Sequence, residues 1–126
     1  MHSNEIVHRD LKPDNILIDD PSNLKSVKVA DFGLSAKYQK SDESQVGTLI
    51  FMSPELIQNK RQTPGADVFA LGIVMYMLLT GGQHPLLSSG RNFSSMDYRN
   101  ELLSISKFDF PSNLSPLAAN LFHKLT

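Results

Sequence analysis

Residues 8–15 read HRDLKPDN and place an acid, a cation and an amide in one short segment. The carboxylate of Asp10 can accept a hydrogen bond from a substrate hydroxyl, and Lys12 puts a positive charge close by. The amide oxygen of Asn15 and the carboxylate of Asp31 are hard ligands suited to Mg²⁺. Taken singly, Asp10 can also be read as a solvated loop residue, and Asn15 and Asp31 as turn formers. Other motifs in the sequence are needed to decide between these readings.

Further motifs follow this segment in a fixed order. Residues 31–33 read DFG after a strand-like run, and Gly47 and Thr48 precede SPE at residues 53–55. HRDLKPDN matches the protein-kinase catalytic-loop signature over its whole length, and the strand that should follow it is present at 16–18. A three-residue match alone is weak, but several in family order reinforce one another. Over essentially its whole length, the chain therefore resembles eukaryotic-type protein kinases.

The resemblance implies phosphoryl transfer from ATP to protein hydroxyls, a reaction in which the protein mainly positions reactants and neutralises charge. Asp10 matches the catalytic aspartate, and Asn15 and Asp31 match the two positions that bind Mg²⁺ and, through it, the nucleotide. Lys12 resembles the residue that contacts the transferring phosphate in serine/threonine kinases, so serine and threonine are the expected acceptors. Leu17 resembles the apolar residue beneath the adenine ring, with a simple strand-core residue as the alternative.

Other motif residues resemble family positions that support the site and do not react. His8 and Phe32 match residues that stack in a hydrophobic column on a central helix, here the helix that carries DVFALG at 67–72. Glu55 matches a glutamate that pairs with an arginine beyond residue 126, so it is expected to lack that partner. The residues with an expected structural role are His8, Arg9, Phe32, Gly33, Glu55 and Asp67.

Arg9, directly before Asp10, resembles the arginine of kinases whose activation loop is ordered by a phosphate. Ser44 is the leading candidate for that phosphate, with Ser41 next and a solvated loop as the alternative. An upstream kinase would then be a partner. Thr48 resembles the threonine that hydrogen-bonds the catalytic aspartate and lysine and helps to form a substrate pocket, which is a positioning role.

Short β-prone runs and one polar segment are expected to position the first motifs. The runs at 16–18 and 27–30 flank a cluster of turn formers at 19–23, which predicts a hairpin. Ile16 and Ile18 are expected to pack inward. Residues 37–45 have no apolar period and are expected to form a loop between ordered pieces.

Three helices are expected after this loop. Thr63 and Pro64 predict an N-cap and first helical residue, and Gly81 begins a stop signal. Because the helix between them is apolar on every side, neighbouring elements are expected to surround it. Weaker helical patterns run over residues 94–106 and 115–125.

Composition limits the other function classes. The net charge of −1 supplies no field to attract nucleic acid or an anionic membrane, and the longest apolar stretch is shorter than the ~20 residues that cross a bilayer. The chain has no cysteine, which excludes a disulfide framework and a thiolate metal site and suits the cytoplasm or nucleus. His2, His84 and His123 show no metal-ligand spacing and are expected to be surface or packing residues.

The expected fold is the C-terminal lobe of a protein kinase, mainly α-helical with short β-hairpins, in one partial domain over residues 1–126. The family's glycine-rich loop, strand lysine and partner glutamate belong to the smaller lobe and have no counterpart here, so the isolated chain is expected to be inactive. Residues 31–37 (DFGLSAK) and 79–85 (LTGGQHP) look most like calcium/calmodulin-dependent kinases. The alternatives are a truncated kinase or pseudokinase that acts as a non-catalytic binding module, and an incomplete gene product.

Overall fold

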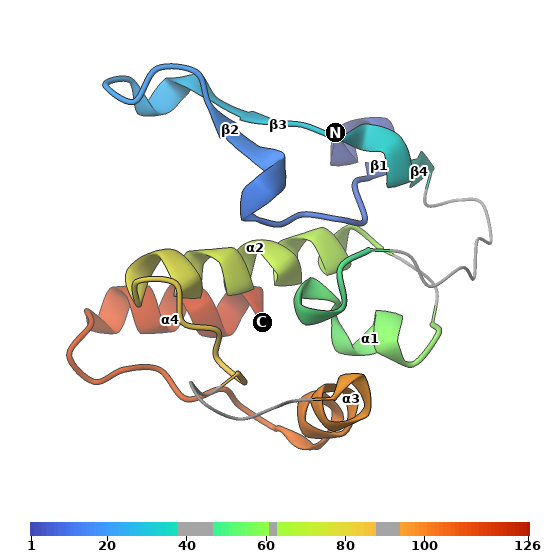
Figure 1. Cartoon of the computed structure of the whole chain (residues 1–126), viewed down its shortest axis with the longest axis vertical. Coiled ribbons are helices and arrows are strands. Elements are labelled where there is room, and N and C mark those ends of the chain that lie inside the picture. The colour runs from blue at the N-terminus through green and yellow to red at the C-terminus, as the bar shows by residue number, and fades with distance from the viewer. Residues whose placement is uncertain (38–46, 61–62, 88–93) are drawn as a thin grey trace. The chain divides into compact units, whose positions relative to one another are not determined.

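The structure is a computed structural model of the 126-residue chain and describes residues 1–37, 47–60, 63–87 and 94–126. The chain divides into two compact units, Met1–Ala70 and Leu71–Thr126, which are considered separately. The described residues include helices and two short antiparallel ribbons, joined by turns and irregular segments (Figure 1). The expected mixture of helices with short hairpins is confirmed for this part of the chain.

The predicted hairpin is present in the first unit as β2 (Ile16–Ile18) and β3 (Val27–Val29). Its connection is closed by side chains, because Asp20 Oδ1 accepts hydrogen bonds from the amide and hydroxyl of Ser22. The hydroxyl of Ser26 adds two bonds to the Asp20 backbone. The register pairs Ile16 with Val29, Leu17 with Lys28 and Ile18 with Val27.

The expectation that both isoleucines of β2 pack inward is wrong for Ile18, which is 54% exposed. Directly opposed residues of an antiparallel pair share a face, so Ile18 and Val27 lie on the same side of the ribbon. Val27 and Val29 are exposed as well, so this face of the ribbon is only partly covered. A two-residue period predicts which side chains share a face, but not whether that face is covered.

A second antiparallel ribbon joins β1 (Ile6–Val7) to β4 (Ala36–Lys37). It was not predicted, because two-residue strands carry no periodic pattern. Its effect is to bring the start of the 8–15 segment beside the end of the segment that holds the DFG motif. The remaining short elements of this unit are η1 (His2–Asn4), η2 (Pro13–Asn15), η3 (Leu24–Ser26), η4 (Phe32–Leu34), η5 (Leu49–Phe51) and α1 (Pro54–Ile57).

The long predicted helix is confirmed as α2 (Pro64–Leu79). Thr63 acts as its N-cap, since the Thr63 hydroxyl oxygen accepts a hydrogen bond from the amide of Gly65 at 3.2 Å. The helix stops where Gly81 and Gly82 adopt φ values of 70° and 93°, a conformation that suits glycine. The sequence signals therefore placed both ends of this helix correctly.

The expectation that neighbours surround α2 on every side is wrong for part of its length. Asp67 and Ala70 in its first turns and Ile73 in the second unit are buried, yet Leu71 is 46% and Leu78 is 77% exposed. These two leucines lie seven residues apart and therefore on one stripe of the helix. No described element packs over that stripe.

Two further helices complete the second unit, α3 (Ser95–Ser104) and α4 (Pro116–Leu125). The hydroxyl of Ser94 and the carboxylate of Asp97 form a reciprocal capping box at the start of α3. Ser115 caps α4 by accepting a hydrogen bond from the amide of Ala118 at 3.1 Å. Both predicted helices are confirmed. No described helix has the length and apolar character that a bilayer crossing requires.

The core of the second unit is aromatic. Phe122 of α4 is fully buried, and its ring centroid lies 5.2 Å from that of Tyr76 on α2 and 5.3 Å from that of Phe110. Gly72 permits the close approach of the two helices, since a Cβ at this position would lie 2.6 Å from Cγ2 of Thr126. Helices α2 and α4 lie side by side as a result (Figure 1).

Ser53, the N-cap residue of α1, offers a stability test. Its side chain is 1% exposed, and its hydroxyl has no hydrogen-bond partner among the described residues. Because a buried unsatisfied polar group costs about 1–3 kcal/mol, Ser53→Ala should raise the free energy of unfolding by about 1 kcal/mol. Urea unfolding measures this, with Ser26→Ala as the matched control. The Ser26 hydroxyl makes two hydrogen bonds, so Ser26→Ala should lower the free energy of unfolding. If Ser53→Ala lowers the free energy of unfolding as much as Ser26→Ala does, the Ser53 hydroxyl is not an unsatisfied buried group.

Candidate active site

The 8–15 segment runs from β1 to β2 and places Asp10 in a buried position. Lys12 is extended, with φ −157°, and Pro13 then begins the single turn of η2. This turn ends at Asn15, which is also buried, and the chain passes directly into β2. The local sequence explains the path, because proline pre-sets the φ angle of a first helical residue.

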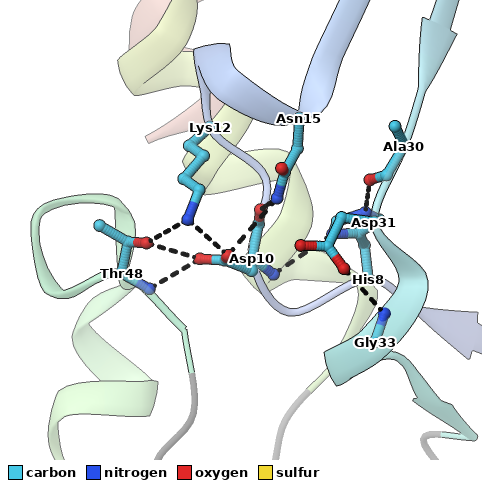
Figure 2. Close-up of polar contacts among 8 residues, drawn as sticks. All are labelled: His8, Asp10, Lys12, Asn15, Ala30, Asp31, Gly33 and Thr48. Atoms are coloured by element: carbon cyan, nitrogen blue, oxygen red, sulfur yellow. Dashed lines mark hydrogen bonds and ion pairs between the residues drawn. The ribbon is translucent and has the colours of Figure 1, made fainter.

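Both oxygens of the Asp10 carboxylate are hydrogen-bonded (Figure 2). Oδ1 accepts from the Thr48 amide at 2.8 Å and from the Thr48 hydroxyl at 2.7 Å. Oδ2 lies 2.8 Å from Nζ of Lys12 and 3.4 Å from Nδ2 of Asn15. Lys12 also donates to the Thr48 hydroxyl at 3.0 Å. The sequence-predicted residues Asp10, Lys12, Asn15 and Thr48 therefore form one polar cluster.

These contacts keep Asp10 ionised. Burial disfavours its charged form, but the hydrogen bonds from Lys12 and Thr48, together with the charge of Lys12, outweigh burial and lower the pKa of Asp10. The same hydrogen bond to Asp10 raises the pKa of Lys12, and the nearby carboxylates of Asp14 and Asp31 add to this rise. The pair is thus a stable carboxylate and a stable cation.

Asp67, in the first turn of α2, fixes the backbone that leads into Asp10. Its Oδ2 accepts a hydrogen bond from the amide of His8 at 2.9 Å, and its Oδ1 accepts one from the amide of Arg9 at 3.0 Å. Arg9 has φ 73°, a left-handed conformation that is costly for a residue with a side chain. Two hydrogen bonds to one buried carboxylate help to hold this conformation in place.

Gly47 fits closely against the same backbone. Its φ is 111°, and a Cβ built on it would lie only 2.4 Å from the carbonyl oxygen of Arg9. Glycine is therefore required for both its conformation and the space available. Because Thr48 follows immediately, this approach also brings the two donors of Thr48 to Asp10.

His8 connects the 8–15 segment to the end of β3. Its Nε2 lies 2.8 Å from the carbonyl oxygen of Ala30, and its Nδ1 lies 3.3 Å from the amide nitrogen of Asp10. The carbonyl can only accept and the amide can only donate, so the ring carries its proton on Nε2. Its ring also meets that of Phe32 edge to face, with centroids 5.0 Å apart. The predicted contact between His8 and Phe32 is present, but the expectation that Phe32 packs inside a hydrophobic column is wrong, since Phe32 is 52% exposed.

Asn15 and Asp31 have the donor chemistry that Mg²⁺ requires. The Nδ2 of Asn15 donates to the backbone oxygen of Asp10 at 2.8 Å, which turns the amide so that its oxygen faces away from Asp10. Asp31 has φ 57°, and its Oδ1 accepts from the amide of Gly33 at 3.2 Å. In Figure 2 its carboxylate points toward the side on which Asp10 and Asn15 lie.

No set of three or more histidine, cysteine or acidic side chains in the described residues could hold a metal. Magnesium does not need such a cage, because it binds through one or two carboxylates and fills its remaining positions with water and phosphate oxygens. Asn15 and Asp31 fit that pattern. Leu17 on β2 is 50% exposed and offers an apolar surface on this ribbon.

Of the remaining predicted residues, the structure describes Arg9 and Glu55 but not the two serines. Arg9 donates from its Nε to the carbonyl oxygen of Leu34 in η4. Glu55 lies half-buried in the first turn of α1. Ser41 and Ser44 lie outside the described residues, and the expectations about them stay predictions.

One contact in this region was not predicted from the sequence. His2, interpreted as a surface or packing residue, places its Nε2 2.7 Å from Oδ2 of Asp67. The two residues are 65 positions apart, and no local spacing could reveal their contact.

Comparison with known proteins identifies the family. The model of the family described as protein kinase domain matches residues 1–126. The chain belongs to this family.

Relatives of this kinase chain include the serine/threonine-protein kinase atg1 of Dictyostelium discoideum. It is 35% identical over 127 residues, which covers 99% of this chain and 18% of that protein. The serine/threonine-protein kinase A of Synechocystis is 39% identical over 93 residues, covering 70% of this chain and 18% of that protein. The chain spans less than a fifth of these curated relatives. Both carry serine/threonine kinase names, which supports the same class for this kinase domain.

The pKa of Asp10 yields a pH-dependent prediction. A carboxylate whose pKa is lowered by folding stabilises the protein above its unfolded pKa of about 3.9, and this contribution is lost as the pH falls through the folded value. Asp10→Asn cannot titrate. Its free energy of unfolding should therefore fall less steeply than that of the wild type between about pH 5 and pH 2. Urea unfolding over a pH series measures the slopes, with the exposed Asp14→Asn as control. Equal slopes for wild type and Asp10→Asn would contradict the prediction.

Proposed function

We propose that this chain is part of an ATP- and Mg²⁺-dependent serine/threonine protein kinase, whose complete form phosphorylates protein hydroxyls. The observation that carries the proposal is the ionised Asp10 carboxylate, which Lys12 and Thr48 hold beside Asn15. The carboxylate of Asp31 points toward the side on which this cluster lies (Figure 2). Phosphoryl transfer requires mainly positioning and charge neutralisation, and this cluster supplies groups for both.

Within the proposed reaction, Asp10 accepts a hydrogen bond from the substrate hydroxyl and orients it for attack. Its low pKa suits this role, because the carboxylate stays an acceptor at neutral pH. Lys12, whose Nζ lies 2.8 Å from Asp10, neutralises charge on the transferring group. Thr48 fixes the rotation of the Asp10 carboxylate through two bonds to a single oxygen. Thr48 thus positions the base and does not react.

Asn15 and Asp31 would hold the Mg²⁺ ion, whose chemical contribution when bound is to neutralise charge on the ATP phosphates. The exposed side chain of Leu17 would lie against the adenine ring. We assign residues 1–126 to the C-terminal lobe. The glycine-rich loop and the lysine that contacts the phosphates would come from a smaller lobe outside this chain, so the isolated chain should be inactive.

The finer assignments rest on sequence alone. The motifs at 31–37 and 79–85 support a calcium/calmodulin-dependent type of kinase, with a regulatory domain as partner. The absence of cysteine supports a cytoplasmic or nuclear location. For activation, Arg9 next to Asp10 supports control by a phosphate on Ser44, with Ser41 as the second candidate.

Transfer by the complete enzyme tests the proposal. With Mg-ATP and a serine- or threonine-containing peptide, Asp10→Asn should lower kcat by about 10²–10⁴-fold, because the base that orients the hydroxyl is lost. Removal of Mg²⁺ should abolish transfer, and a tyrosine-only peptide should not be phosphorylated. Asp19→Asn, an exposed control whose carboxylate pairs with Lys28, should leave kcat unchanged.

Either of two outcomes would refute this reading. Unchanged transfer by Asp10→Asn would remove Asp10 from the reaction. Peptide binding with no transfer by the complete wild-type enzyme would instead favour the binding-module alternative.

Ser44→Ala in the complete enzyme tests the activation proposal. Loss of the phosphate that pairs with Arg9 should lower kcat about tenfold, on the scale of a charge-assisted hydrogen bond. Phosphatase treatment should lower the wild-type rate similarly and leave the variant unaffected. Ser41→Ala serves as the comparison. Unchanged turnover of Ser44→Ala would contradict the assignment.

A further inference from the structure

A cavity of about 240 Å³ lies between two turns of the second unit. One turn follows α2 and the other precedes α4, and Figure 1 shows the end of α2 and the start of α4 at the same end of this helix pair. The lining consists of three apolar and three uncharged polar residues: Leu79, Pro111 and Leu114, with Thr80, Gln83 and Asn113. No residue of the Asp10 cluster lines this cavity.

Both turns are closed by hydrogen bonds of their own. The Thr80 hydroxyl lies 2.8 Å from the carbonyl oxygen of Tyr76 and 3.1 Å from that of Gln83. In the other turn, the amide of Leu114 donates to the carbonyl of Pro111 at 3.1 Å. The walls of the cavity thus hold their shape without a ligand. Binding would then cost little of the entropy that is lost when loops become ordered.

Two side-chain amides at the cavity are available to a ligand. Gln83 and Asn113 are exposed, and neither side chain forms a hydrogen bond within the described residues. A side-chain amide offers a donor and an acceptor on one carbon, so it can pair with the N–H and C=O of a peptide backbone. No charged side chain lines the cavity, so an ionic ligand would lose hydration there without gaining a counter-charge. The polar groups therefore suit an uncharged ligand rich in peptide groups.

Leucines supply most of the apolar wall and continue beyond it. Leu78 adjoins Leu79 in α2, and Leu117 follows Leu114 by three residues in the first turn of α4. Leu78 is 77% and Leu117 is 83% exposed, and exposed apolar side chains that flank a cavity are typical of an interaction surface. The volume is slightly below the roughly 300–1,000 Å³ of pockets for drug-sized ligands. It suits one aliphatic side chain with its flanking backbone.

We propose that this cavity binds an uncharged peptide segment of a partner protein. One aliphatic side chain of the segment, of the size of leucine, packs against Leu79 and Leu114. The backbone of the segment pairs with the amides of Gln83 and Asn113. The site belongs to the second unit and uses none of the groups assigned to phosphoryl transfer, so it goes beyond the proposed function and does not depend on it.

Titration of the complete enzyme with short capped peptides tests this site. The probe is acetyl-Ala-Leu-Ala-amide, followed through leucine methyl and side-chain amide signals in NMR spectra. The signals of Leu79, Leu114, Gln83 and Asn113 should shift together with a Kd of about 1 mM, a scale that fits so small a ligand. The same peptide with an N-methylated leucine lacks one backbone N–H and should bind about tenfold more weakly. Acetyl-Ala-Asp-Ala-amide should not bind.

Two variants test the amides directly. Gln83→Ala and Asn113→Ala each remove one amide and should weaken binding of the leucine peptide about tenfold, on the scale of one hydrogen bond. Asn120→Ala is the matched control, because Asn120 is an exposed amide on α4 that does not line the cavity. All three substituted side chains are exposed, so the fold should persist, and unchanged methyl signals of the buried Leu102 would show this.

Octanamide separates peptide recognition from a general preference for apolar ligands. It has an alkyl chain but only one amide, so it should bind more weakly than the leucine peptide. Equal or tighter binding of octanamide would overturn the proposed ligand class. The proposal would also be overturned by the absence of shifts at about 10 mM peptide, or by unchanged affinity in either Gln83→Ala or Asn113→Ala. The titration contains no ATP, so a complete enzyme without transfer would refute the proposed function and leave this test intact.

Discussion

The site depends on one buried carboxylate with several hydrogen-bond donors. An isolated charge is costly to bury, and Asp67 is acceptable in this position because the amides of His8 and Arg9 and the ring of His2 converge on it. The bonds join the first turn of a long helix to a segment about sixty residues earlier in the chain. They also support a backbone conformation at Arg9 that its own side chain disfavours.

Other features of the site follow from this fixed backbone. Once the carbonyl of Arg9 is held, only a residue without Cβ can approach as closely as Gly47 does. Thr48 is then adjacent and directs two donors at Asp10. Asn15 fastens the other end of the segment through the backbone oxygen of Asp10. The geometry of one acid is thereby set by contacts from three separate parts of the sequence.

The sequence predicted what is encoded locally. Turn formers marked the β2–β3 hairpin, and capping residues such as Ser94 and Ser115 marked the helix starts. The motifs also named the residues that gather around Asp10. The sequence could not predict contacts between residues far apart in the chain, or whether a neighbouring element packs over an apolar side chain. The His2–Asp67 contact leaves no local pattern, and apolar residues such as Ile18 and Leu78 look like core residues until their surroundings are known.

The two oxygens of Asp10 are unequal. Oδ1 already accepts two short bonds from Thr48, whereas Oδ2 has one short bond, from Lys12, and a long contact to Asn15. A carboxylate oxygen commonly accepts about two hydrogen bonds, so the remaining acceptor capacity lies on Oδ2. An arriving hydroxyl would thus meet a one-sided acceptor with an ammonium group beside it. In the proposed phosphoryl transfer, such a site would select the direction of approach before any bond to phosphorus begins to form.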